Sequence, residues 1–94
     1  MLYPYITLMS KHMKLLNRFL SKPKDFTYNE LKTLLSGFDY IELTKGSTSG
    51  SRISFYNQNV DHIICLHKPH PKNILKFYQI ELIIEELKSK EIIL

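Results

Sequence analysis

Arg52 and His67 are the two residues of this sequence whose side chains best suit phosphate chemistry. The guanidinium of arginine binds a phosphate through two parallel hydrogen bonds and stays protonated near neutral pH. The imidazole of histidine titrates near neutrality and can act as a general acid or base. If the fold brings them together, the pair predicts a site for phosphodiester chemistry. The structural alternative is that His67 and His70 only hydrogen-bond across the adjacent proline bend.

Two predicted β-strands carry this pair. Residues 51–56 alternate between the two faces of a strand, and residues 62–67 form the next strand after a short polar turn. Short links favour antiparallel pairing, which places neighbours on one face about 5–8 Å apart. Arg52 then lies opposite Cys65 or His67, depending on the register of the turn. Ile53 and Phe55 are expected on one face, with Arg52, Ser54 and Tyr56 on the other.

Two helices are predicted ahead of these strands. Apolar residues recur at helical spacing over residues 11–21, and Pro23 stops that helix. Thr27 and Glu30 have the spacing of a capping box that opens the second helix. Gly37 stands where a residue in the left-handed conformation is expected to end it.

A further strand and a last helix complete the predicted elements. Residues 40–45 are β-prone and form the first of three strands. The last helix is expected over residues 73–88, and residues 91–94 are a candidate C-terminal strand. The buried side of the last helix is predicted to consist of Phe77, Ile80, Ile83, Ile84 and Leu87.

This order predicts one α+β domain over residues 1–94, with helices on one face of a three-stranded antiparallel sheet. The chain is long enough for one hydrophobic core and too short for two. The other face of the sheet stays open, either as a platform for a ligand or merely solvated. Residues 1–10 are a candidate flexible segment. Within it, residues 1–8 are either dispensable or disordered, with translation starting at Met9 instead of Met1, or they form a short edge strand or a pinning arm. Both interpretations stay open.

Composition and charge narrow the class of protein. The net charge of +4 leans toward a polyanionic partner. The single cysteine, Cys65, excludes an internal disulfide and indicates a reducing compartment. The N-terminal segment is too short for a membrane span and lacks the pattern of a signal peptide. We therefore expect a cytoplasmic protein without a membrane partner.

Metal and nucleotide motifs are not indicated. Gly46 and Gly50 precede a strand instead of a helix, which disfavours a phosphate-binding P-loop. His62, His67 and His70 include candidate zinc ligands, but strand alternation places the first two on opposite faces. No carboxylate has an evident position to complete a ligand set. The sequence predicts neither a metal nor a cofactor.

The segment 44–71 combines a small polar loop, two strands and a proline-rich bend. Gly50 and Ser51 open the second strand, and residues 64–66 lead to a histidine before the final helix. This combination resembles the HicA family of bacterial toxins, and the resemblance covers residues 25–94, with an additional helix ahead of them. It implies a fold like that of a double-stranded-RNA-binding domain, cleavage of mRNA without a required metal, and neutralisation by a HicB-type antitoxin.

The chain departs from this family at one position of the motif. Arg52 stands where the family has its catalytic histidine, and an arginine cannot serve as an ordinary general base. We therefore expect a divergent variant in which Arg52 holds the scissile phosphate and His67 acts as base or acid. The predicted RNA-binding residues are Lys45, Gly50, Ser51, Ser54, Lys68, His70 and Lys72.

Two other functions are open at this level. If Arg52 has replaced the catalytic histidine and no other residue has taken over the role of that histidine, the protein is a non-catalytic RNA-binding module. It is a protein-interaction domain if the open sheet face binds another protein, for which Tyr40, Tyr56 and Ile63 at exposed positions are suited.

Overall fold

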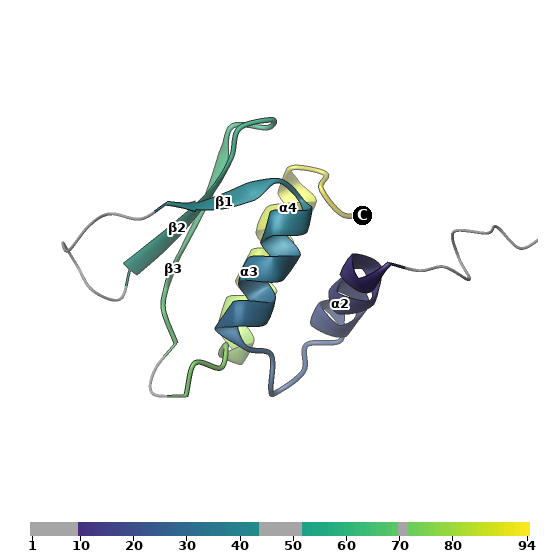
Figure 1. Ribbon diagram of the computed structural model, residues 1–94, viewed down its shortest axis with the longest axis vertical. Helices are drawn as coiled ribbons and strands as arrows, with labels where there is room; N and C mark the ends of the chain where they lie inside the picture. Colours follow the sequence, from purple (N-terminus) through teal and green to yellow (C-terminus); the bar gives the residue numbers. More distant parts are fainter. Residues whose placement is uncertain (1–9, 44–51, 70–71) are drawn as a thin grey trace, which may run out of the picture.

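The computed structural model describes residues 10–43, 52–69 and 72–94. Within these ranges the elements follow in the predicted order of two helices, three strands and a helix (Figure 1). Residues 1–9, on which the two candidate start positions fall, lie outside the described residues. The elements are α2 (Lys11–Leu20), α3 (Tyr28–Gly37), β1 (Tyr40–Leu43), β2 (Arg52–Asn57), β3 (His62–His67) and α4 (Phe77–Ser89).

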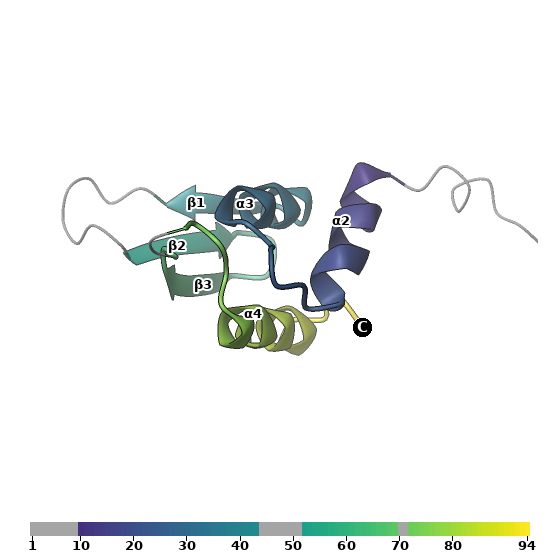
Figure 2. The ribbon, with the colours of Figure 1, turned by 90° about the horizontal axis from the view of Figure 1, so that it is seen from below.

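The three strands form one antiparallel sheet in the order β1-β2-β3, so β2 is central. Both α3 and α4 pack on the same face. The ring of Tyr28 in α3 lies 6.3 Å from that of Phe55 in β2, and Glu86 of α4 hydrogen-bonds His62 of β3. Figures 1 and 2 show the sheet at one end of the molecule, α2 at the other, and α3 and α4 between them. The predicted α+β class, with helices on one face of a three-stranded sheet, is confirmed.

The alternation predicted for β2 and β3 is also confirmed. Phe55 is buried toward the helices, whereas Arg52 and His67 are exposed on the opposite face. The hydrophobic core therefore lies between the sheet and the helices, and it continues under α2. Its fully buried apolar side chains are Phe19, Phe26, Leu31, Leu34, Leu35, Phe55, Ile80, Ile83 and Leu87.

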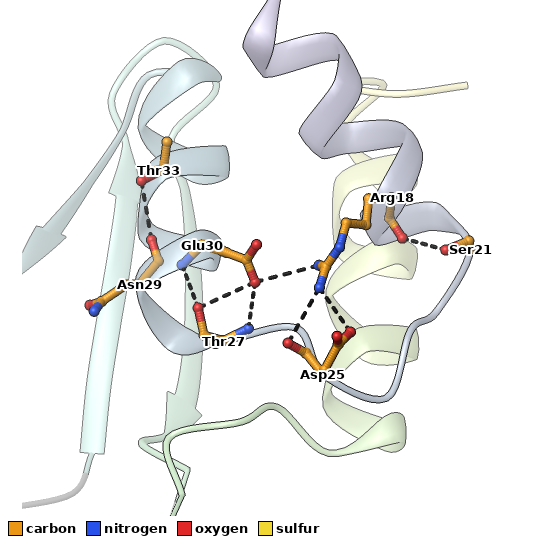
Figure 3. Close-up of polar contacts among 7 residues, drawn as sticks. All are labelled: Arg18, Ser21, Asp25, Thr27, Asn29, Glu30 and Thr33. Carbon is orange, nitrogen blue, oxygen red and sulfur yellow. Dashed lines mark hydrogen bonds and ion pairs between the residues drawn. The ribbon is translucent and has the colours of Figure 1, made fainter.

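Polar contacts at the start of α3 also hold α2 in place (Figure 3). The predicted capping box is present: Thr27 Oγ1 accepts from the amide of Glu30 at 3.1 Å, and Glu30 Oε1 accepts from the amide of Thr27 at 2.9 Å. Arg18 of α2 donates to Asp25 Oδ1 at 2.8 Å and to the same Glu30 oxygen at 3.4 Å. Its guanidinium also lies over the ring of Phe26. The segment between the two helices is therefore fixed by both charge and packing.

Gly37 does not have the predicted left-handed conformation. It is the last residue of α3, and Asp39 is the residue with positive φ, 74°. An aspartate tolerates this conformation at a helix end. The glycine is needed for another reason, because a Cβ at position 37 would collide with the ring of His12 in α2. That ring donates from Nε2 to the carbonyl of Leu34 at 2.9 Å and meets the ring of Phe38 edge-on.

Gly37→Ala should therefore have opposite effects on stability in two backgrounds. In the natural chain, the new methyl group displaces His12 and breaks its hydrogen bond, at a cost of about 1–3 kcal/mol. In a His12→Ala background, the same change should stabilise the protein by about 0.5–1 kcal/mol through helix propensity. Urea unfolding of the natural chain, the two single variants and the double variant measures both changes in the free energy of unfolding. An effect of the same sign in both backgrounds would contradict this packing argument.

The last helix begins four residues later than predicted, at Phe77 instead of 73. Residues 73–75 run alongside the start of α3: Tyr28 N donates to Asn73 O at 2.9 Å, and Leu75 N donates to Phe26 O at 2.8 Å. Asn73 has a φ of 62°, which also interrupts a helix. Phe77 then occupies the first helical position and is 58% exposed, so its assignment to the buried side was wrong.

The predicted C-terminal strand at 91–94 is also absent. Glu91 takes a left-handed φ of 58°, and the amide of Ile92 donates back to Leu87 O at 2.9 Å. These features end α4 in a turn that reverses the chain. Ile92 and Ile93 then pack against the hydrophobic core. These contacts, and not a β-strand, account for the apolar residues at positions 92 and 93.

The buried side of α4 gives a direct stability prediction. Ile84 is 7% exposed, and Ile80 and Leu87 are fully buried as predicted. Ile84→Ala should lower the free energy of unfolding by about 2–5 kcal/mol, because it removes buried methyl groups and leaves a cavity. Leu82→Ala is the matched control on the exposed side of the helix and should change it by no more than about 0.5 kcal/mol. A loss below about 0.5 kcal/mol for Ile84→Ala would show that this face of α4 contributes little.

Candidate functional site

Arg52 and His67 are directly opposite one another on the open face of the sheet. The register pairs Asn57 with His62 at the turn, and this pairing selects His67 over Cys65 as the partner of Arg52. Directly opposed residues have their Cβ atoms about 5 Å apart. Both side chains are exposed, and within the described ranges neither makes a hydrogen bond or ion pair. Both are therefore free to contact a ligand.

The side chain of Asn57 fixes the turn that sets this register. Its Oδ1 accepts from the amide of Asn59 at 2.9 Å, and its Nδ2 donates to Phe38 O at 2.9 Å. Asn57 is 1% exposed, so its side chain is shielded from water while it makes both bonds. Asp61 completes the turn with a positive φ of 51°. A buried amide in the last position of β2 thus determines which residues face each other further along the strands.

Gln79 holds the end of β3 that carries His67. Its Nε2 donates to His67 O at 3.0 Å, and its Oε1 accepts from the amide of Lys76 at 3.0 Å. Gln79 is 5% exposed and lies in the first turn of α4. The first turn of α4 is thereby fixed beside His67. Sequence reasoning missed this residue, although a glutamine three positions after the N-cap residue, here Lys76, is a capping signal.

Ser54 lies opposite Cys65 in the middle of the open face, with Oγ and Sγ 3.3 Å apart. Ser54 faces the same side as Arg52, as predicted. The thiol of Cys65 is exposed. Ser54 and Cys65 are therefore neighbours of the Arg52–His67 pair and contribute small polar groups to the face.

Lys68 points away from this face. Its Nζ lies 5.4 Å from the centre of the Tyr28 ring, on the side of the sheet that the helices cover. There it joins Lys32 and Glu42, whose carboxylate accepts from the Tyr28 hydroxyl at 2.7 Å. Burial raises the pKa of Glu42, but the hydrogen bonds from Tyr28 and Lys32 and the charges of Lys32 and Lys68 outweigh it, and the net shift is downward. The structure therefore separates Lys68, one of the predicted RNA-binding residues, from Arg52 and His67.

An apolar row crosses the sheet at the other end of the open face. Tyr56 lies opposite Ile41 on one side and Ile63 on the other. The two isoleucines are 61% and 50% exposed. The Tyr56 hydroxyl donates to Asp61 Oδ1 at 3.1 Å, and this bond, with some desolvation and the negative charge of Asp61, raises the pKa of Tyr56.

Tyr40 was expected on the surface but is 3% exposed. Its hydroxyl lies 2.7 Å from Nδ1 of His62, whose Nε2 lies 2.6 Å from Glu86 Oε1. Because a carboxylate only accepts, Nε2 carries a proton, and the Tyr40 hydroxyl pairs with the other ring nitrogen, Nδ1. Burial and the charge of Glu86 raise the pKa of Tyr40. This buried cluster ties β1, β3 and α4 together, and it places His62 on the opposite face from His67, as predicted.

Several predicted site residues fall outside the described ranges, namely Lys45, Gly50, Ser51 and His70. Lys72 is described and exposed. Among the residues that the structure describes, no group of three or more histidine, cysteine or acidic side chains is arranged to hold a metal ion.

The fold and the site thus define a small α+β protein with an arginine–histidine pair on an open sheet face. No protein-family model, curated protein or solved structure matches the chain. None of the helices within the described ranges has both the length and the apolar character needed to cross a bilayer.

Proposed function

We propose that this protein is a HicA-like RNA-binding toxin that cleaves mRNA without a metal and is neutralised by a HicB-type antitoxin. The observation that carries the proposal is the register of β2 and β3, which puts Arg52 directly opposite His67 on an exposed face. The order of helix, three antiparallel strands and helix, which the resemblance implies, supports it. The net charge of +4 and the unpaired Cys65 are in keeping with an RNA partner in the cytoplasm.

The proposed chemistry is attack of the ribose 2′-oxygen on the adjacent phosphorus. His67 takes the proton of the 2′-hydroxyl, the bond from O2′ to phosphorus forms, and the bond from phosphorus to O5′ breaks. The departing O5′ receives a proton from water or from protonated His67. Arg52 binds the non-bridging oxygens and stabilises the negative charge on the pentacoordinate phosphorus. The products are a 2′,3′-cyclic phosphate and a 5′-hydroxyl end.

An end-group assay with the purified protein tests this function. Cleavage of a single-stranded RNA should persist in EDTA and leave 2′,3′-cyclic phosphate ends. Replacing the RNA by its 2′-deoxy analogue should abolish cleavage, because the nucleophile is missing. Binding without cleavage would instead favour a non-catalytic RNA-binding module. Loss of cleavage in EDTA that returns with a divalent ion would contradict the mechanism.

The antitoxin is proposed to cover the same face. Arg52 supplies a positive charge there, with His67 opposite it, and Tyr56 on the same face supplies an apolar surface, so an acidic domain with apolar side chains fits. Hydrogen exchange of the purified toxin–antitoxin complex should show new protection in β2 and β3. Protection confined to α2 would contradict this placement.

A protein-interaction domain is the second candidate function, and one observation favours it. The row Ile41–Tyr56–Ile63 exposes two large aliphatic side chains beside an aromatic one, which is typical of a protein-binding surface. Absence of RNA binding at low salt, together with loss of a protein partner in Ile41→Ser or Ile63→Ser, would support this function over the first.

A further inference from the structure

The open sheet face changes in character from one end to the other. Near the turn between β2 and β3 it is apolar, with Tyr56 between Ile41 and Ile63. At the opposite end it is cationic, with Arg52 beside His67. Both ends lie on the same face of β2, because Arg52 and Tyr56 are four positions apart and side chains at even spacing point to the same side of a strand.

Tyr56 is held in a fixed position at the apolar end. Its hydroxyl is anchored on Asp61 at 3.1 Å, and its cross-strand partners are Ile41 of β1 and Ile63 of β3. A ring that is already ordered loses little side-chain entropy when a flat ligand stacks on it. The carboxylate of Asp61 repels a phosphate at this end, so a nucleic-acid backbone is directed toward Arg52.

The distance between the two ends indicates the state of the nucleic acid. Four residues of β-strand span roughly 13 Å, which separates Tyr56 from Arg52 along β2. Two nucleotides in a stacked helix rise only about 7 Å along the axis. A strand whose bases are unstacked and splayed out can cover the longer distance, and unpaired RNA is recognised in this way, with bases placed on aromatic side chains.

We propose that the open face binds unpaired RNA, with one base stacked on Tyr56 and a phosphate about two nucleotides away on Arg52, next to His67. A duplex keeps its base faces inside the helix and offers none to Tyr56, so it is not a ligand of this surface. This inference rests on the proposed function and adds the substrate class and a base-binding residue to it.

Three probes of equal length test the inference: an unpaired 2′-O-methyl oligoadenylate, a 2′-O-methyl backbone without bases, and a blunt 2′-O-methyl duplex. All three lack the 2′-hydroxyl nucleophile, so binding is measured without cleavage. Fluorescence anisotropy with the full chain should show that the oligoadenylate binds about 5- to 150-fold more tightly than the backbone without bases. The duplex should bind no more tightly than that backbone.

Substitutions of Tyr56 locate the stacked base. Tyr56→Ala should weaken oligoadenylate binding to the level of the backbone without bases, and leave binding of that backbone unchanged. Tyr56→Phe keeps the ring and should restore most of the affinity. Tyr78→Ala is the control, since Tyr78 is an exposed tyrosine on α4, away from the open sheet face, and it should have no effect. If Tyr56→Ala does not fold, Tyr56→Leu takes its place, and its affinities for the oligoadenylate and for the backbone without bases are compared in the same way.

The outcomes separate this inference from the proposed function. Tight binding of the duplex overturns the stacking site but leaves RNA binding standing. The same conclusion follows if Tyr56→Ala lowers the affinity for the oligoadenylate and for the backbone without bases by the same factor. No binding of any probe at low salt overturns both. If Tyr56→Ala loses a protein partner and keeps its affinity for oligoadenylate, the apolar row is a protein-binding surface and the inference is wrong.

Discussion

His67→Ala should lower the rate of RNA cleavage by about 10²–10⁴-fold while leaving RNA affinity nearly intact. The size of the loss is the usual contribution of a general acid or base. Affinity is spared because the phosphate contact is assigned to Arg52, which stands directly opposite on β2. Single-turnover cleavage at saturating protein measures the rate, and the 2′-deoxy analogue measures the affinity.

Two further variants sharpen this result. Arg52→Ala should reduce both cleavage and affinity, because it removes a phosphate contact as well as the charge that stabilises the transition state. Cys65→Ser is the matched control on the same face of β3 and should cut at close to the natural rate. If His67→Ala cuts at the natural rate, the base lies elsewhere and His70 is the next residue to replace. His62 is excluded from that role by its burial between Tyr40 and Glu86.

Phe55→Ala should lower the free energy of unfolding by about 3–5 kcal/mol, a large part of the roughly 5–15 kcal/mol typical of a small domain. Phe55 is 1% exposed at the centre of β2, where its ring meets that of Tyr28. Removing it leaves a cavity between the sheet and α3 that neighbouring strands cannot fill without moving. Urea or thermal unfolding of the variant measures the loss.

Ile41→Ala is the control for Phe55→Ala, since Ile41 lies on the exposed face of the sheet and should change stability by no more than about 0.5 kcal/mol. RNA binding by Phe55→Ala should follow the folded fraction, because Phe55 lies on the covered face and Arg52 and Tyr56 on the open one. A loss of stability below about 1 kcal/mol would show that the centre of the sheet is not the main packing site.

The sequence alone determined the features that depend on neighbouring residues. A strand has a period of two, so the order of residues in β2 was enough to place Arg52, Ser54 and Tyr56 on one face and Phe55 on the other. The capping box of Thr27 and Glu30 is likewise a contact between residues three apart. Such short-range patterns predicted the elements, their order and the α+β class.

Helix ends were predicted less well, because contacts from distant segments determine them. The start of α4 moved from 73 to Phe77 because residues 73–75 bond to the segment before α3. The role of Gly37 changed because α2 places His12 against it. The local sequence does not reveal either contact, because Asn73 and Gly37 are residues that commonly stand at helix ends.

Only the tertiary structure decided the geometry of the candidate site. The alternation of β2 and β3 allowed either Cys65 or His67 opposite Arg52, and the buried amide of Asn57 in the turn made the choice. Packing of α4 added Gln79 behind His67, and packing of α3 drew Lys68 to the covered side. A strand's period fixes the face on which a residue lies, whereas its partner across the sheet depends on bonds formed between segments far apart in the chain.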